Sequence, residues 1–156
     1  MKKTNTRRGF TLIELLVVIL IIGILAAVAV PQYRIAVIKS RAQSIYPVMA
    51  ALQNAEGTYY LAHEQYTNDY NSLDISLPCT LKAKNRMSCG KDWVIDLTGT
   101  AIIGHYCPEL DVQSDYGHGA CISGTKRMLY LYWYLPRGRN CFSEDTLGKE
   151  VCKKLY

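Results

Sequence analysis

One carboxylate stands at the start of the longest apolar run in this chain. Glu14 is followed by residues 15–30, which include no charged or hydrogen-bonding side chain. A charged group in such a run costs about 2.5 to 3.5 kcal/mol at the middle of a membrane and less near its surface, so it usually marks a function. Glu14 therefore needs a cationic partner, and a freed α-amino group in a bundle of helices could neutralise it.

The residues around Glu14 divide into a basic leader, a small residue and an apolar helix. Phe10 to Val30 would cover roughly 31 Å as a helix, which is about the hydrocarbon thickness of a bilayer. Positive charge before such a segment favours a cytoplasmic leader and a single membrane span. A cleaved secretory signal peptide is the alternative, with Ala27-Val28-Ala29 as its cleavage site, but that interpretation leaves Glu14 unexplained.

The stretch Gly9-Phe10-Thr11-Leu12-Ile13-Glu14 resembles the processing motif of type IV pilins and type II secretion pseudopilins. In that family a prepilin peptidase cuts on the cytoplasmic side after the glycine, and the new N-terminal phenylalanine is N-methylated. The resemblance implies cleavage between Gly9 and Phe10, methylation of Phe10, and pairing of Glu14 with a neighbouring subunit's N-terminal amine. It makes residues 1–9 a cleaved leader and residues 10–30 the transmembrane and filament-core helix.

Gly23 and Pro31 are the first two breaks in the helical pattern. Proline removes one backbone hydrogen bond and crowds the preceding turn, so Pro31 predicts a bend or a locally loosened helix. Pilins carry a glycine and a proline at matching places, and the resemblance implies that this stretch can unwind in a filament. A kink where the helix leaves the membrane is the simpler alternative.

Residues 31–63 are expected to continue the helix as an amphipathic segment. Apolar side chains recur at steps of three and four and form one stripe, whereas Glu56 and most charged residues fall elsewhere. The stripe consists of Ile45, Val48, Leu52, Ala55 and Tyr59. Pro47 predicts a second gentle bend, and the helix is expected to end near His63. A free coiled coil is disfavoured because the heptad pattern is not sustained.

Residues 64–156 are expected to form one small globular head, because only about ninety residues remain after the helix. Trp93 to Leu97, a Thr98-Gly99 turn and Thr100 to Ile103 predict a β-hairpin. Met128 to Leu135 alternates cleanly and predicts the central strand, with one face against the helix. That face consists of Leu129, Leu131, Trp133 and Leu135.

Six cysteines all follow the helix: Cys79, Cys89, Cys107, Cys121, Cys141 and Cys152. An even count confined to a small extracytoplasmic head favours three disulfides in an oxidising compartment. Of the fifteen possible connectivities we expect the sequential one, because each bond then closes a short loop. It pairs Cys79 with Cys89, Cys107 with Cys121, and Cys141 with Cys152. The last loop resembles the disulfide-bounded C-terminal loop of pilins.

Enzyme and metal sites find little support in the sequence. His63, His105 and His118 are widely spaced, and no Ser, Cys or Asp motif supplies a catalytic partner. Zinc is disfavoured because the chain has no Cys-x-x-Cys pair. Glu144, Asp145 and Glu150 could suggest calcium, which some pseudopilins bind in a C-terminal loop, but their spacing is unlike an EF-hand. The chain is therefore expected to be no enzyme and to need no cofactor.

Nucleic-acid binding is also a minor expectation. Two basic clusters lie near tyrosines, an arrangement that can hold single-stranded DNA. The clusters consist of Lys82, Lys84, Arg86 and Lys91, and of Lys126, Arg127, Arg137 and Arg139. The formal charge of +5 includes four positive residues in the leader, so the processed chain is close to neutral. No strong field for nucleic acid remains after processing, and a solvated face is the simpler interpretation.

These patterns predict an α+β fold in which a long N-terminal helix packs on a small antiparallel sheet with disulfides, as in pilins. The resemblance implies a filament subunit stored in the bacterial inner membrane with a periplasmic head and later exposed on a surface pilus. Its expected partners are the bilayer, prepilin peptidase, other pilins, further copies, and an assembly platform with an ATPase. A type II secretion pseudopilin in a periplasmic pseudopilus is the main alternative, and a minor DNA-uptake pilin or an anchored enzyme is less favoured.

Overall fold

A computed structural model describes residues 10–107 and 129–156 of the chain. It divides into two compact units, Met1–Arg34 and Ile35–Tyr156, and each unit is described by itself. Helix α1 (Leu12–Ser44) begins in the first unit and ends in the second, where α2 (Tyr46–His63) follows. A short 3-10 turn, η1 (Tyr70–Ser72), leads from α2 into the sheet.

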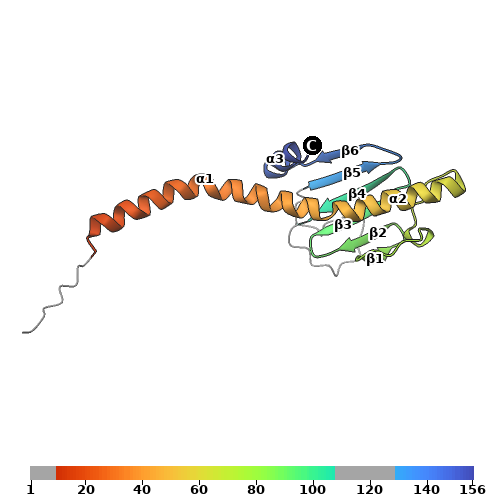
Figure 1. Ribbon diagram of the computed structural model, residues 1–156, viewed down its shortest axis with the longest axis horizontal. Coiled ribbons are helices and arrows are strands. Elements are labelled where there is room, and N and C mark those ends of the chain that lie inside the picture. Colours follow the sequence, from red (N-terminus) through yellow and green to blue (C-terminus); the bar gives the residue numbers. More distant parts are fainter. Residues whose placement is uncertain (1–9, 108–128) are drawn as a thin grey trace, which may run out of the picture. The chain divides into compact units, whose positions relative to one another are not determined.

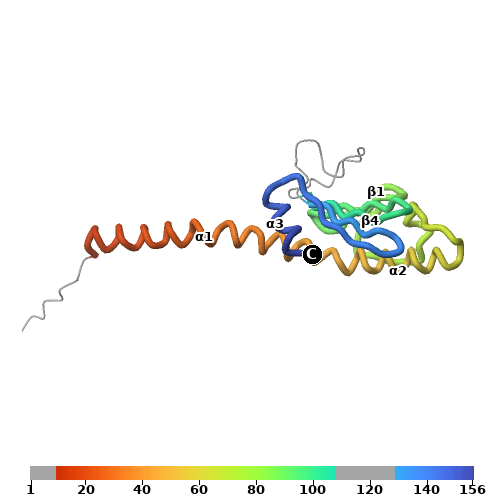
Figure 2. The backbone as a smooth tube through the Cα atoms, turned by 90° about the horizontal axis from the view of Figure 1, so that it is seen from above, coloured from red at the N-terminus to blue at the C-terminus, as the bar shows by residue number. Residues whose placement is uncertain are grey.

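The second unit contains a six-stranded antiparallel sheet, and the strands lie side by side in sequence order (Figure 1). The strands are β1 (Thr80–Ala83), β2 (Arg86–Cys89), β3 (Trp93–Leu97), β4 (Ala101–Tyr106), β5 (Leu129–Tyr134) and β6 (Arg139–Phe142). Helix α3 (Thr146–Leu155) follows β6, and α2 covers one face of the sheet (Figure 2). The expected α+β architecture, a long N-terminal helix with an antiparallel sheet, is confirmed.

The helix predicted from Phe10 to His63 is interrupted at one residue. Ile45 separates α1 from α2, and Pro47 lies in the first turn of α2. Proline has no N–H to donate to the carbonyl of Gln43 four residues earlier, so the hydrogen-bond ladder breaks here. The predicted bend at Pro47 is thus a short interruption. The predicted end at His63 is correct, and Glu64 caps α2 with a left-handed backbone at φ 58°.

The buried face of the helices is rotated slightly from the predicted stripe. The side chains buried at steps of three and four are Ile38, Ala42, Ile45, Met49, Leu52 and Glu56. Val48, Ala55 and Tyr59 lie at the margin of this face and are only partly buried. The prediction that Glu56 lies outside the buried face is therefore wrong, because Glu56 is fully buried.

The inner face of the sheet supplies the other half of the core. Its fully or nearly fully buried side chains are Trp93, Ile95, Leu97, Ile102, Tyr106, Leu129, Leu131 and Trp133. Helix and sheet lie close together at Gly104, where an added Cβ would lie 3.2 Å from the Met49 sulfur. A side chain at this position would require the Met49 side chain to shift by a few tenths of an ångström.

The predicted hairpin is confirmed, and the predicted central strand is displaced. Strands β3 and β4 pair antiparallel and are joined by a turn at Thr98 and Gly99, where Gly99 has φ +76°. The inward face of β5 is as expected, but β5 is the fifth strand, and β3 and β4 occupy the middle. The sequence signal missed this order because β1, β2 and β6 have only four residues each, too few for their alternation to stand out from the surrounding loops.

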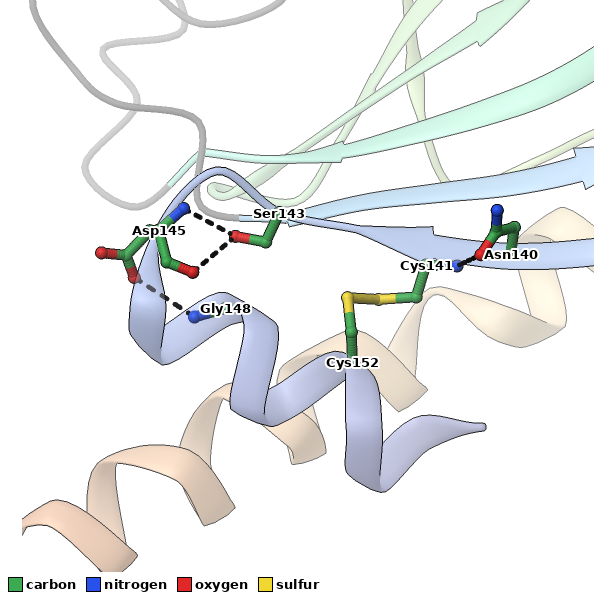
Figure 3. Close-up of a disulfide and its surroundings, with 6 residues drawn as sticks. All are labelled: Asn140, Cys141, Ser143, Asp145, Gly148 and Cys152. Atoms are coloured by element: carbon green, nitrogen blue, oxygen red, sulfur yellow. Dashed lines mark hydrogen bonds between the residues drawn. A yellow bond between two sulfur atoms is a disulfide. The ribbon is translucent and has the colours of Figure 1, made fainter.

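Helix α3 was not expected from the sequence, although its start is well defined (Figure 3). The Asp145 carboxylate accepts hydrogen bonds from the N–H groups of Leu147 at 3.0 Å and Gly148 at 3.2 Å, which makes it the N-cap. The Cys141–Cys152 disulfide ties α3 to β6. The C-terminal loop expected between these cysteines is therefore the end of β6 followed by α3.

Disulfides join Cys79 to Cys89 and Cys141 to Cys152. Cys107 is also disulfide-bonded, and its expected partner, Cys121, lies outside the described residues. On the edge strand β6, the Cys141 N–H donates to the side-chain oxygen of Asn140 at 2.8 Å, as Figure 3 shows. A side chain of the same strand thus satisfies this backbone donor.

Glu56 is a buried acid whose charge the fold tolerates poorly. One carboxylate oxygen accepts a hydrogen bond from the Thr67 N–H at 3.1 Å, and the other has no partner among the described residues. Burial raises the pKa of Glu56 above its ordinary value of 4.5, and the Thr67 hydrogen bond opposes this shift only in part. The protonated acid thus stabilises the fold at low pH, and this contribution is lost as pH rises through the raised pKa.

We expect Glu56→Gln to stabilise the full chain at pH 8 by on the order of 1 kcal/mol, because the amide keeps an acceptor for Thr67 without a buried charge. At pH 4 the substitution should change little, since the acid is then protonated. Thermal unfolding in detergent micelles at both pH values measures the effect. Glu150→Gln, at an exposed acid in α3, is the control, and an equal midpoint shift at both pH values would contradict the explanation.

Candidate functional site

The first turn of α1 is closed by a reciprocal hydrogen-bond pair between Thr11 and Glu14. The Glu14 N–H donates to the Thr11 hydroxyl at 3.3 Å. One Glu14 carboxylate oxygen, Oε2, accepts from the Thr11 N–H at 2.8 Å and from the Thr11 hydroxyl at 2.7 Å. This is a capping box, in which two backbone donors at the start of a helix are satisfied by side chains.

The capping box sets the position of the Glu14 carboxylate. Its hydrogen bonds to Thr11 all use Oε2, so among the described residues Oε1 accepts none. The Thr11 nitrogen lies 2.8 Å from Glu14 Oε2. Successive backbone nitrogens lie about 3 to 4 Å apart, so the nitrogen of Phe10 is within about 7 Å of this carboxylate. An α-amine freed at Phe10 could therefore neutralise the Glu14 of its own chain or that of a neighbour. Gly9, on the other side of the expected cut, lies outside the described residues.

The helix after the capping box exposes a continuous apolar surface. The large apolar side chains between Leu12 and Val30 are 46% to 81% exposed. Phe10, Ile13, Glu14, Val17 and Val18 line a shallow depression of about 390 Å³ on this surface. In the described part of the chain, this is the one helical segment long and apolar enough to cross a membrane. The surface needs lipid or other helices to cover it.

Gly23 and Pro31 both lie inside α1. A Cβ added at Gly23 would meet nothing within 4 Å, so packing inside the single chain does not require glycine there. Pro31 leaves the carbonyl of Ala27 without its helical N–H donor. The weak stretch between Gly23 and Pro31 stays a prediction, and glycine would matter there for backbone freedom or for a neighbouring helix.

The three histidines do not come together among the described residues. His63 stacks on Tyr59, with its Nδ1 3.0 Å from the carbonyl oxygen of Tyr59. His105 lies on the opposite face of the sheet from α2, with its Nε2 3.2 Å from Asp96. His118 lies outside the described residues, as do Lys126 and Arg127 of the second basic cluster.

Asp96 holds the charged network that the sequence did not reveal. Arg86 donates two hydrogen bonds to the Asp96 carboxylate, each 2.6 Å long. His105, on the next strand, contacts the same carboxylate. Burial alone would raise the pKa of Asp96, but these hydrogen bonds outweigh it and lower the pKa to about 2. The stability that this ionised acid contributes is lost only as pH falls through that value. The network joins β2, β3 and β4.

Two of the three acids considered for calcium have other roles in the structure. Asp145 caps α3, and Glu150 pairs with Lys153 at 2.9 Å. Within residues 10–107 and 129–156, no group of three or more His, Cys, Asp or Glu residues is arranged to hold a metal ion. The arrangement that carries chemical meaning is thus the Thr11–Glu14 capping box beside Phe10. Its signature, Thr-x-x-Glu before an apolar run, is visible in the sequence, but Thr11 was missed as a functional residue.

Comparison with known proteins agrees with this emphasis on the N-terminus. Residues 4–30 match the prokaryotic N-terminal methylation motif. The type IV major pilin protein PilE of Neisseria gonorrhoeae is 36% identical over 78 residues, 50% of this chain and 47% of that protein. The type IV major alpha-pilin of Moraxella bovis is 36% identical over 104 residues, 62% of this chain and 63% of that protein.

A secretion protein is also similar to this chain. Type II secretion system core protein G of Escherichia coli (strain K12) is 38% identical over 74 residues, 47% of this chain and 51% of that protein. The chain spans about half the length of the known relatives it matches. No solved structure shows significant similarity to it.

We expect Thr11→Val to loosen the first turn of α1, because valine keeps the shape of threonine without the hydroxyl that accepts from Glu14. A lost cap costs about 1 kcal/mol, so the Glu14 amide should exchange with solvent about five-fold faster. Amide hydrogen exchange of the chain in detergent micelles measures this. Thr11→Ser retains the hydroxyl and is the matched control, and equal exchange in the valine and serine variants would refute the capping role.

Proposed function

We propose that this chain, which carries the prokaryotic N-terminal methylation motif and has type IV pilins among its relatives, is a structural subunit of a type IV pilus-like filament. The observation that carries the proposal is the bare apolar helix that begins with a single capped carboxylate, Glu14. Nothing inside the described chain covers that helix or neutralises that charge. Both needs are met when many copies pack their helices together.

Processing between Gly9 and Phe10 supplies the missing positive charge. Cleavage by a prepilin peptidase removes the basic leader, residues 1–9, and frees an α-amine within a few ångströms of Glu14. N-methylation of Phe10 leaves this amine able to carry a positive charge. In the membrane the amine neutralises the acid of its own chain, and in the filament it pairs with the acid of a neighbour.

Membrane storage follows from the lengths and charges of the N-terminal segments. Residues 10–30 span the inner membrane once, the leader stays in the cytoplasm, and residues 64–156 form a head in the periplasm. Disulfides in the head suit that oxidising compartment. The amphipathic residues 31–63 connect the two parts. Inner-membrane assembly proteins with an ATPase then extract the subunits toward the cell surface.

Helix packing in the filament exchanges lipid contacts for helix contacts. This exchange has little hydrophobic driving force of its own, because lipid tails are as apolar as leucine side chains. An unpaired acid in that core would be costly, so pairing of Glu14 with a neighbouring amine selects one axial register. Gly23 and Pro31 supply the segment that loosens as helices adjust to this register.

A pseudopilin of a type II secretion system is the second candidate function. It is favoured by the 38% identity to core protein G, which falls in about half of each chain. The same membrane helix, cleavage site and carboxylate would then build a short periplasmic filament. The disulfide-rich head favours the pilus interpretation, since two disulfides and a disulfide-bonded Cys107 stabilise an exposed domain.

We expect protein sheared from the cell surface to begin with N-methylated Phe10, which intact mass measurement and N-terminal sequencing will test. Removal of residues 1–9 and one added methyl group predict a single mass. The same processed form found only in the cell envelope would support the pseudopilin instead. A mature chain that starts beyond Ala29 would overturn both functions, because it would have lost the apolar helix.

We expect Glu14→Gln to be cleaved and methylated normally but to yield at least about ten-fold fewer surface filaments, because glutamine caps the helix without pairing with an amine. Immunoblots of membrane and sheared fractions measure the ratio of stored to assembled subunit. Glu150→Gln, a neutralised acid in α3, controls for the change in net charge. Wild-type filament levels in Glu14→Gln would show that charge pairing does not set the register.

A further inference from the structure

A groove of about 1260 Å³ lies on the second unit between the C-terminal half of α2 and the turn that joins β5 to β6. Six of the residues that line it are Gly57, Tyr60, Leu61, Tyr66, Arg137 and Arg139. Tyr60 stacks on Tyr66 with ring centres 4.7 Å apart, and Leu61 is 85% exposed. These side chains give the groove an apolar floor that is open to solvent.

The β5–β6 turn gives the groove its charge. The Arg139 guanidinium lies 4.0 Å from the ring centre of Trp133, and this cation–π contact fixes its position. Arg137 is exposed and forms no ion pair with any described residue. None of the described side chains that line the groove is acidic. A suitable occupant therefore presents an apolar group together with a carboxylate.

The far end of β6 presents such a pair. Phe142 is 51% exposed, and its ring centre lies 5.8 Å from that of Tyr130. Glu144 is exposed and has no ion pair among the described residues, whereas the neighbouring Asp145 is occupied as the N-cap of α3. The Cys141–Cys152 disulfide ties this corner to α3, so the pair is held on a rigid frame (Figure 3).

The groove and this pair lie at opposite ends of β6. In Figure 1 the β5–β6 turn lies beside α2, and β6 leads away from it toward α3. Arg139 and Phe142 are three residues apart on the strand, a distance of about 10 Å. Copies inserted in one membrane all point the same way, so their contacts in a filament join two different patches. A repeating contact of that kind extends a filament without closing it into a ring.

We propose that the groove between α2 and the β5–β6 turn receives Phe142 and Glu144 of a second copy of this chain, an inference that rests on the proposed filament function. Phe142 packs on the apolar floor made by Tyr60 and Leu61. Glu144 pairs with Arg137 at the rim. The contact adds a specific link between heads to the packing of the helices, and its two halves are complementary in both charge and polarity.

Charge reversal tests the ion pair. We expect Arg137→Glu and Glu144→Arg each to lower the filaments recovered by shearing about five-fold at equal levels of membrane-stored subunit. The double variant Arg137→Glu/Glu144→Arg should recover at least half of the wild-type yield, since the pair is re-formed in reverse. Lys82→Glu, on the opposite edge strand β1, makes the same charge change as Arg137→Glu and should leave the yield unchanged.

Cross-linking tests the position of the aromatic ring. Replacement of Phe142 by the photoreactive p-benzoylphenylalanine should yield, on irradiation of intact filaments, covalent dimers joined to residues 53–66 or 136–139, as peptide mass spectrometry shows. The same replacement at Leu81 on β1 is the control and should not label the groove. Cross-links from position 142 to other segments would overturn the docking surface.

The possible results separate this inference from the proposed function. A wild-type chain that forms no filament overturns both. If the wild-type chain forms filaments and neither charge reversal lowers their yield, the docking surface is overturned and the filament function stands. The same holds if the single variants lower the yield and the double variant does not restore it. Repair in the double variant together with cross-links into the groove supports the docking surface.

Discussion

The carboxylate of Glu14 needs a donor or a positive charge wherever the helix around it lies. Water meets this requirement at little cost in free energy. In lipid or among apolar helices, an unpaired ionised acid is among the most destabilising groups that a chain can contain. The Thr11–Glu14 capping box meets part of the requirement, because both Thr11 donors bind one oxygen of the carboxylate. The proposed cleavage between Gly9 and Phe10 would meet the rest, and it would link a proteolytic step to the energetics of the packed helices.

In the second unit, a small core must keep α2 and the end of α1 packed on the sheet. The buried helix face and the inner side of the sheet are in tight contact where Met49 lies over Gly104. Disulfides at Cys79–Cys89 and Cys141–Cys152 fasten the edges of the sheet, where the strands are shortest. The centre of the sheet is therefore stabilised by packing, and its margins are stabilised by covalent bonds.

The parts of the fold that follow one physical signal could be predicted from the sequence. Apolar runs and alternation defined the helix, the β3–β4 hairpin and the inward face of β5. Glu56 could not be placed, because a helix position one step from the apolar stripe turns inward or outward according to the sheet beneath it. Helix α3 was not predicted because Asp145, its N-cap, was interpreted only as a possible metal ligand. The Thr11–Glu14 hydrogen bonds could have been predicted, whereas the Arg86–Asp96–His105 network depends on strand register.

Asn140 has a consequence for the behaviour of many heads held close together. An edge strand with unpaired N–H groups can pair with strands of neighbouring molecules, and this aggregation becomes more frequent as the local concentration rises. On β6 the side-chain oxygen of Asn140 occupies the Cys141 N–H, and the disulfide to Cys152 fixes α3 beside the same residue. One N–H of the β6 edge is thus unavailable to a strand of a neighbouring molecule, which disfavours growth of the sheet across chains at high local concentration.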